Sequence, residues 1–158
     1  GTMLAWLKLD ACYHRYRFNL ETGQTKEERK EDLLSEFPVI NNRFGGLPSR
    51  YSYHVTIADT DVILFDSLVK IDSLTGKRQQ FEFPEGCFGS EVQFAPRHNS
   101  NAEDDGYLIS FVTNMESMKG EIQIFPAEDL SKGPICRLIV PQQIPPGFHR
   151  SFVLPENL

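Results

Sequence analysis

Residues 16–23 read Tyr-Arg-Phe-Asn-Leu-Glu-Thr-Gly, a strand-forming segment that runs into a Glu-Thr-Gly turn. Residues 68–76, Leu-Val-Lys-Ile-Asp-Ser-Leu-Thr-Gly, repeat this design, and residues 122–133 repeat it again; the terminal glycines are 53 and then 57 residues apart. Glycine supplies the positive φ that a tight hairpin end requires. A period near 50 residues, with about four short strands in each copy, is that of a propeller blade. We therefore predict an all-β fold of about three β-propeller blades; the alternative is a β-sandwich whose hairpins merely look alike.

Strand-forming residues also dominate the rest of the chain, and Gly, Pro, Asn or Asp bound each segment. The best helical candidate, residues 26–34, lacks an apolar stripe and leads into Pro38, so we expect at most a turn or two of helix there. Its basic residues are interleaved with glutamates, which indicates a solvated hairpin edge. The segments that we expect to form strands are residues 13–20, 61–71, 107–113, 121–125 and 135–140.

Composition narrows the function classes. The net charge of −6 and the pI of about 5.2 argue against a nucleic-acid partner, which needs a clustered basic face. The three cysteines, Cys12, Cys87 and Cys136, form no CxxC pair, so a zinc ribbon or a thioredoxin-like site is not expected and a reducing compartment is favoured. No apolar run approaches the roughly 20 residues of a membrane helix.

Histidine is the commonest ligand for iron, zinc and copper. No two of the four histidines have HxH or HxxxH spacing, and we expect His14, His54 and His98 to have structural or surface roles. His149 follows a Pro-Pro-Gly turn and lies in a short apolar segment. If this segment is a strand, His149 and Ser151 share one face and residues 148, 150 and 152 share the other. A histidine at the inner end of a propeller strand points at the central axis; the alternative is a satisfied core histidine.

Two glutamates occupy similar places, each a little after a copy of the repeat. Glu36 and Glu91 both follow a serine and precede apolar residues. A buried carboxylate needs a partner, and a metal-bound imidazole that donates its second N–H is a suitable one. The alternative is an exposed glutamate at a sheet edge.

Five motifs resemble those of the carotenoid cleavage oxygenases, and they occur in the order of that family. Residues 35–41 resemble its EFP motif, and residues 43–53 its G-x-x-x-RYxY stretch. Residues 89–97 resemble the SE-x-x-F-x-PR segment, and residues 103–112, Glu-Asp-Asp-Gly-Tyr-Leu-Ile-Ser-Phe-Val, the EDDGYLLSFV signature. Residues 147–149 match the GFH that ends the catalytic region. Arg150-Ser151-Phe152 departs from the GFHG-x-W ending that is common among relatives.

The resemblance implies a seven-bladed propeller with Fe(II) on its axis, held by four histidines, three of which are hydrogen-bonded by glutamates. His149 would be one iron ligand, and Glu36 and Glu91 would be two of the glutamates. Propellers close with about four to eight blades. We therefore expect residues 1–158 to be the C-terminal part of a single propeller domain whose N-terminal blades, with the other ligands, are needed to close the ring.

The function implied by the resemblance is cleavage of a conjugated C=C double bond by O2. The substrate would be a carotenoid, an apocarotenoid or a stilbene-like alkene, and the products two carbonyl compounds. The isolated chain, with one ligand, would be inactive. The alternatives are an iron-dependent isomerase of the same family, a non-enzymatic propeller scaffold, and an inactive fragment. We expect a cytoplasmic or plastid protein with peripheral membrane contact.

Overall fold

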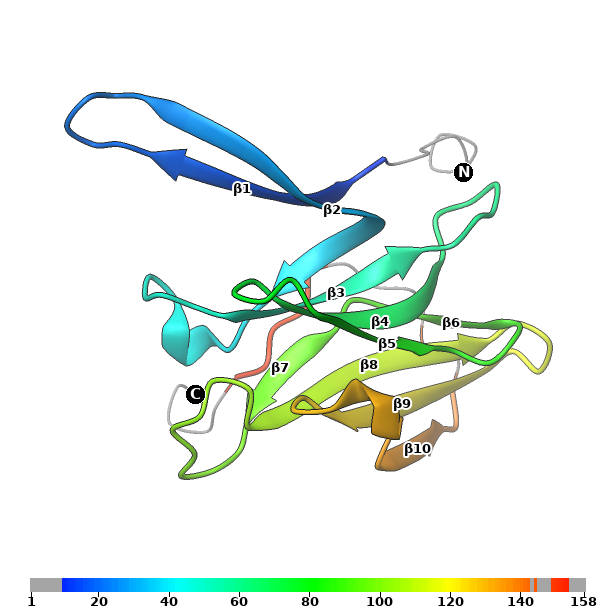
Figure 1. Cartoon of the computed structure of the whole chain (residues 1–158). Coiled ribbons are helices and arrows are strands. Elements are labelled where there is room, and N and C mark those ends of the chain that lie inside the picture. Colours follow the sequence, from blue (N-terminus) through cyan, green and yellow to red (C-terminus); the bar gives the residue numbers. More distant parts are fainter. Residues whose placement is uncertain (1–9, 143, 145–148, 154–158) are drawn as a thin grey trace.

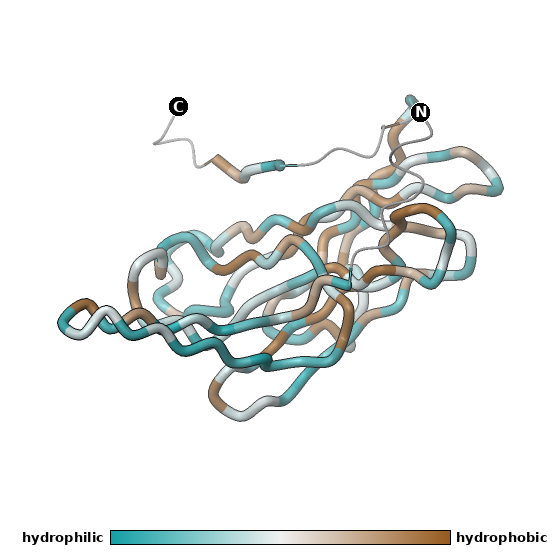
Figure 2. The backbone as a smooth tube through the Cα atoms, turned by 90° about the horizontal axis from the view of Figure 1, so that it is seen from above, coloured by the Kyte–Doolittle hydropathy of each residue, from teal (hydrophilic) through white to brown (hydrophobic). Residues whose placement is uncertain are grey.

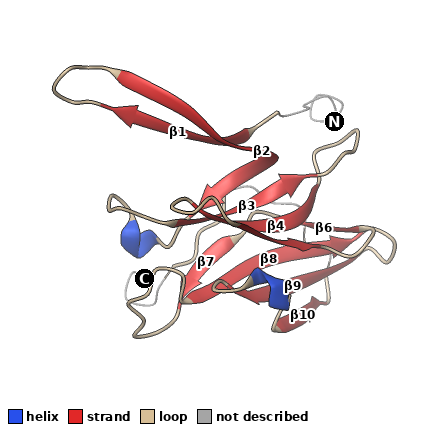
Figure 3. Ribbon diagram, in the orientation of Figure 1, coloured by secondary structure: helices blue, strands red, loops and turns tan. Residues whose placement is uncertain are grey.

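The computed structural model describes residues 10–142, 144 and 149–153. In this part of the chain the regular elements are strands joined by turns and two short 3-10 helices (Figure 3), which confirms the all-β prediction. The strands are β1 (Cys12–Phe18), β2 (Thr25–Val39), β3 (Tyr51–Ile57), β4 (Phe65–Asp72), β5 (Arg78–Glu82), β6 (Cys87–Gly89), β7 (Gln93–Pro96), β8 (Gly106–Asn114), β9 (Lys119–Pro126) and β10 (Cys136–Val140); the 3-10 helices are η2 (Asn42–Phe44) and η3 (Leu130–Lys132).

The strands form two antiparallel four-stranded units. The first is the second half of β2 followed by β3, β4 and β5, and the second is β7, β8, β9 and β10 (Figure 1). The short strand β6 pairs with both β4 and β8 and so joins the units. A four-stranded antiparallel meander is the unit of a propeller blade, while the hairpin of β1 and the first half of β2 extends away from both units (Figure 1).

The repeated turns have the geometry that the sequence indicates. Gly23, Gly76 and Gly133 have φ values of 72°, 70° and 68°. They lie between β1 and β2, between β4 and β5, and before β10. Each is in the left-handed region that glycine adopts without a steric cost, so the repeat is a real structural repeat of hairpin ends.

Residues 26–34, for which the sequence allowed at most a turn or two of helix, contain no helix and belong to β2. Its first half pairs with β1 and its second half with β3. The acidic and basic side chains of this segment form ion pairs within β2, such as Lys30 with Glu28 at 2.6 Å, and Glu27 pairs with His14 of β1 at 2.6 Å. Tertiary pairing therefore overrides a weak helical propensity, and the solvated hairpin edge is confirmed.

The core lies between the two four-stranded units. Alternate residues of β8 are buried, whereas nearly all of β4 is buried, because both of its faces are covered. Figure 2 shows the corresponding alternation of hydrophobic and hydrophilic segments along the chain. The most deeply buried apolar side chains are Val55, Leu68, Val69, Val92, Leu108, Phe125, Ala127 and Leu130.

The Glu103-Asp104-Asp105 stretch connects the loop before β8 to neighbouring elements. Glu103 Oε1 accepts hydrogen bonds from the backbone N–H groups of Arg50 and Tyr51, both at 2.7 Å. Asp104 pairs with the buried Lys70 at 2.7 Å. Asp105 pairs with Arg97 at 2.6 Å, and hydrogen bonds from Ser100 and then from Arg97 lower the pKa of the Asp105 carboxyl. Each acid of this motif therefore has a structural partner.

Candidate metal-ligand site at His149

The carboxylate of Glu91 holds two successive backbone amides. Glu91 lies in the connection between β6 and β7, where its residue is 4% exposed. Its Oε1 accepts a hydrogen bond from the N–H of His149, and its Oε2 accepts one from the N–H of Arg150 at 3.0 Å. The expectation that Glu91 is buried and partnered is confirmed, but the hydrogen bonds come from the main chain.

Side chains reinforce the contact between residues 90–91 and 149–150. Arg150 Nη1 donates to Ser90 Oγ at 2.7 Å, and its guanidinium lies 4.0 Å from the ring centroid of Phe111. Burial lowers the pKa of Arg150, and the charge of Glu91 opposes this. Guanidinium stacking and a charge-assisted hydrogen bond are both favourable in a partly dry site. Three hydrogen bonds therefore join the two dipeptides, and we call this arrangement the Glu91 clamp.

His149 itself has an unusual backbone conformation. Its φ is +63°, in the left-handed region. Residues 149–153 form no strand, so the prediction that alternate residues of this segment share a face is wrong for them. A left-handed residue does not continue an extended chain. Phe148, which belongs to the same prediction, lies outside the described residues.

The His149 imidazole is accessible and lies beside the buried acid. Its side chain is 86% exposed, and its Nδ1 is 3.9 Å from Glu91 Oε1. The ring meets the edge of the Phe37 ring, with 6.0 Å between centroids. The alternative of a satisfied core histidine does not hold in this chain. The arrangement leaves Nε2 on the side of the ring away from the carboxylate contact.

Glu36 reaches this region through its neighbour Phe37. Glu36 is half-buried on β2, at a break in the register between β2 and β3. Phe37 N–H donates to Glu36 Oε2 at 3.3 Å, and the Phe37 ring packs against both Phe65 and His149. Phe37 also has a positive φ, +51°. The structure therefore brings the three predicted residues into one region, with Glu91 in contact with His149 and Glu36 linked to it through Phe37.

Whether this chain can hold an iron ion by itself depends on which potential metal-ligand side chains lie together. Within the described residues there is no group of three or more His, Cys, Asp or Glu that could hold a metal. His14 bonds Glu27, His98 is exposed, and His54 is buried, which lowers its pKa to about 4. His54 and His98 therefore have the buried and surface positions that the sequence predicts for residues outside the site. An accessible imidazole next to a buried carboxylate fits one ligand of a shared site.

Sequence reasoning missed the main-chain clamp and the contact between Phe37 and His149. A left-handed phenylalanine has no sequence signal, because β-bulges are set by pairing. One sequence signal was available for the bond between Arg150 and Ser90: Arg150 departs from the GFHG-x-W ending that is common among relatives.

The fold and the site define a class: an all-β protein built from propeller blades, with a histidine braced by a buried glutamate. The sequence model of the family described as "Retinal pigment epithelial membrane protein" matches residues 6–154, and the chain belongs to this family.

Among curated proteins, the chain is 33% identical over 159 residues to carotenoid 9,10(9',10')-cleavage dioxygenase 1 of Arabidopsis thaliana, covering 92% of this chain and 29% of that protein. It is 31% identical over 140 residues to the carotenoid cleavage oxygenase of Mycobacterium tuberculosis, covering 85% of this chain and 28% of that protein. The chain thus spans about 29% of the length of the first curated relatives.

Among solved structures, cobalt-substituted Synechocystis apocarotenoid oxygenase superposes with a TM-score of 0.77 at 25% identity, covering 84% of this chain and 28% of that one. The chain therefore forms blades of a seven-bladed β-propeller, as predicted. Within the described residues, no helix is long and apolar enough to cross a membrane.

Proposed function

We propose that the intact protein is a non-haem Fe(II) dioxygenase that cleaves a conjugated C=C double bond with O2 to give two carbonyl products. The substrate class is a carotenoid, an apocarotenoid or a stilbene-like alkene. The relatives named for carotenoid cleavage support the reaction. The cobalt-substituted relative supports a metal site in the family.

The observation that carries the proposal is the strained and clamped histidine. Non-glycine residues at positive φ cost of order 1–3 kcal/mol and persist where the surroundings over-determine them, often at functional sites. His149 and Phe37 are both in this region and contact each other. The Glu91 clamp holds the strained backbone of His149 by two hydrogen bonds. A surface histidine without a role would not need this support.

Each residue of the clamp has a distinct task in this proposal. Glu91 fixes the position of His149 through the main chain, and its charge lies near Nδ1. Arg150 keeps Ser90 and Glu91 in place through its bond to Ser90 Oγ. Phe37 limits rotation of the imidazole by packing against its ring. When bound, ferrous iron would supply an open position for O2 beside the alkene. Glu36 would brace a second histidine, from outside the described residues.

A small apolar hollow beside Arg150 supports an apolar substrate. Its volume is about 180 Å³, and its walls include Leu64, Phe88, Phe111, Met115, Met118 and Ile144. Drug-sized ligands fill about 300–1,000 Å³, so this hollow fits one end of a long alkene. The rest of the substrate path would lie between this chain and the remaining blades, which we propose complete the ring and carry any peripheral membrane contact.

The experiment is product analysis of the intact protein under labelled O2 with three substrates: a carotenoid, an apocarotenoid and a stilbene. Oxidative cleavage predicts two carbonyl products that carry label from O2. An uncleaved product without label would assign the iron-dependent isomerase instead, and no turnover of any of the three by iron-loaded protein would contradict the proposal.

A further inference from the structure

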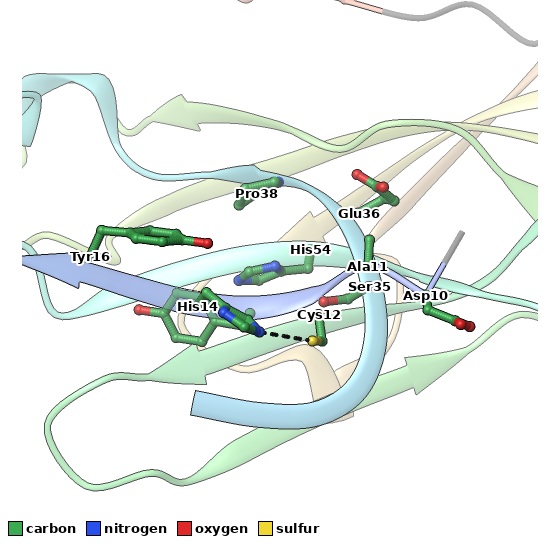
Figure 4. Close-up of a pocket in the computed structure, with 10 residues that line it drawn as sticks. Asp10, Ala11, Cys12, His14, Tyr16, Ser35, Glu36, Pro38 and His54 are labelled. Carbon is green, nitrogen blue, oxygen red and sulfur yellow. Dashed lines mark hydrogen bonds between the residues drawn. The ribbon is translucent and has the colours of Figure 1, made fainter. Parts of the chain in front are cut away.

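Three side chains of β1 and one of β2 form a hydrogen-bonded chain that the proposed iron chemistry does not use. Cys12, His14 and Tyr16 are every second residue of β1, and their side chains contact one another in sequence although the register with β2 shifts between Cys12 and His14. Cys12 Sγ lies 3.3 Å from His14 Nε2, and His14 Nδ1 lies 2.6 Å from Glu27 Oε1 (Figure 4 shows the first contact). The Tyr16 hydroxyl also donates to Glu27, at 3.0 Å.

This order of groups is that of an activated nucleophile. A thiol touches an imidazole, and a carboxylate orients the imidazole from its other nitrogen. With the proton on Nδ1 donated to Glu27, Nε2 is the free acceptor next to sulfur, a tautomer assigned from the hydrogen-bond network. The hydrogen bonds from His14 and Tyr16 lower the pKa of Glu27, so this acid stays ionised and holds the ring. Cys87 and Cys136 have no histidine contact among the described residues.

A hollow of about 470 Å³ lies against these residues. Figure 4 shows Cys12, His14, Tyr16, Ser35 and His54 around it. Ala11, Tyr13 and Pro38 make much of the remaining wall apolar, and two carboxylates, Asp10 and Glu36, complete it. This volume is within the range of small-molecule sites.

Ser35 provides an independent sign of a ligand. Its residue is only 5% exposed, and its Oγ has no hydrogen-bond partner within the described part of the chain. Its backbone N–H bonds Ala11 O at 2.9 Å, which places the residue beside the start of β1. An unpartnered buried hydroxyl costs about 1–3 kcal/mol, and a ligand oxygen in the hollow would supply the missing acceptor.

We infer that Cys12 is a nucleophilic thiol that adds reversibly to the carbonyl carbon of an apolar aldehyde held in this hollow. His14 Nε2 takes the proton from sulfur, the S–C bond forms, and the C=O π bond breaks. The resulting alkoxide takes the proton back from His14 and receives a hydrogen bond from Ser35 Oγ. The product is a hemithioacetal, and neither an oxidant nor a reductant is needed.

The choice of an aldehyde follows from the groups that line the hollow. The described residues offer no group of three metal ligands, and one hydroxyl donor suits a single carbonyl oxygen. The link to alkene cleavage rests on the proposed function, whose carbonyl products would supply such aldehydes. Octanal, which has no C=C bond, tests the thiol site separately from iron and O2.

The test is the labelling of the intact protein by iodoacetamide, followed at each cysteine by peptide mass spectrometry with and without octanal. Cys12 should be labelled roughly tenfold faster than Cys87 and Cys136, because its imidazole neighbour removes the proton. Octanal should protect Cys12 and leave Cys136 unprotected. Labelling of Cys12 at the rate of Cys136, or equal protection of both, would overturn the inference.

Three variants separate the roles of these residues. His14→Gln should slow labelling of Cys12 about tenfold, and Glu27→Gln, a milder change on the exposed hairpin, should slow it less. Ser35→Ala should leave the labelling rate unchanged but weaken protection by octanal about fivefold, the value of one neutral hydrogen bond. Unchanged protection in Ser35→Ala, or unchanged labelling in both His14→Gln and Glu27→Gln, contradicts the assigned site.

Discussion

The Glu91 clamp leads to a quantitative prediction for Glu91→Gln. The carboxylate accepts two backbone hydrogen bonds, from His149 and Arg150. A glutamine amide of the same size keeps one acceptor oxygen and turns an NH2 group toward the second donor. The variant therefore loses one hydrogen bond to a charged group and leaves a backbone N–H unsatisfied, which costs about 2–3 kcal/mol.

The assay is native-state hydrogen exchange at the amides of residues 149 and 150, because exchange reports the free energy of local opening. A loss of about 2–3 kcal/mol lowers protection roughly 30- to 150-fold. Activity of the intact enzyme should fall by roughly 10–100-fold through the misplaced ligand. The iodoacetamide labelling of Cys12 should not change, because that site lies on the β1–β2 hairpin.

Glu103→Gln is the matched control, because a single oxygen of Glu103, Oε1, accepts the amides of both Arg50 and Tyr51, whereas Glu91 uses both of its oxygens. The glutamine oxygen at position 103 can keep both hydrogen bonds, so exchange at residues 50 and 51 should change much less than exchange at residues 149 and 150 does in Glu91→Gln, and residues 149 and 150 should stay protected. If Glu91→Gln leaves the protection of residues 149 and 150 at the wild-type level, the clamp does not hold His149 and the reasoning from buried carboxylate to positioned ligand is refuted.

Three further predictions concern stability. Burial lowers the pKa of His54 to about 4 from its ordinary 6.5, so its contribution is complete above pH 6.5 and is lost as the pH falls toward 4, by about 3 kcal/mol in total; urea unfolding across this range should show the decline in wild type and a flatter curve in His54→Gln, and equal curves would contradict it. Lys70→Met removes the partner of Asp104, which is partly exposed, and should lower the unfolding free energy by about 2 kcal/mol; a change below 0.5 kcal/mol, on the order of a surface substitution, would contradict it. Arg150→Ala removes the bond to Ser90 and the contact with Phe111 and should cost about 1–2 kcal/mol; unaltered exchange at residues 149 and 150 would show that the guanidinium does not support the clamp.

Much of the fold could be predicted from the sequence, because its signals are local. The glycines of the repeat need a left-handed φ, and residues 107–113 are rich in strand-forming side chains and form most of β8. The strand at residues 26–34 had a much weaker sequence signal. A polar segment without an apolar stripe has no hydrophobic periodicity that distinguishes a helix from a strand. Pairing with β1 and β3 therefore determines that it is a strand.

The site could be predicted only in part, because its geometry depends on contacts between residues that are distant in the sequence. The burial of Glu91 follows from its apolar surroundings, but the direction of its carboxylate depends on a contact 58 residues away in the chain. The conformation of His149 is likewise a tertiary effect, since a φ of +63° opposes its own preference. Neither result can be read from spacing along one strand.

The most direct test of the central claim is the iron content of the intact protein when His149 is replaced by Ala, with His98→Ala as the matched control. His98 is exposed and far from the clamp in the sequence. The account predicts that the His98 variant keeps the iron content of the wild type while the His149 variant loses its iron. An iron content in the His149 variant equal to that of the wild type would contradict the assignment of this imidazole as a ligand.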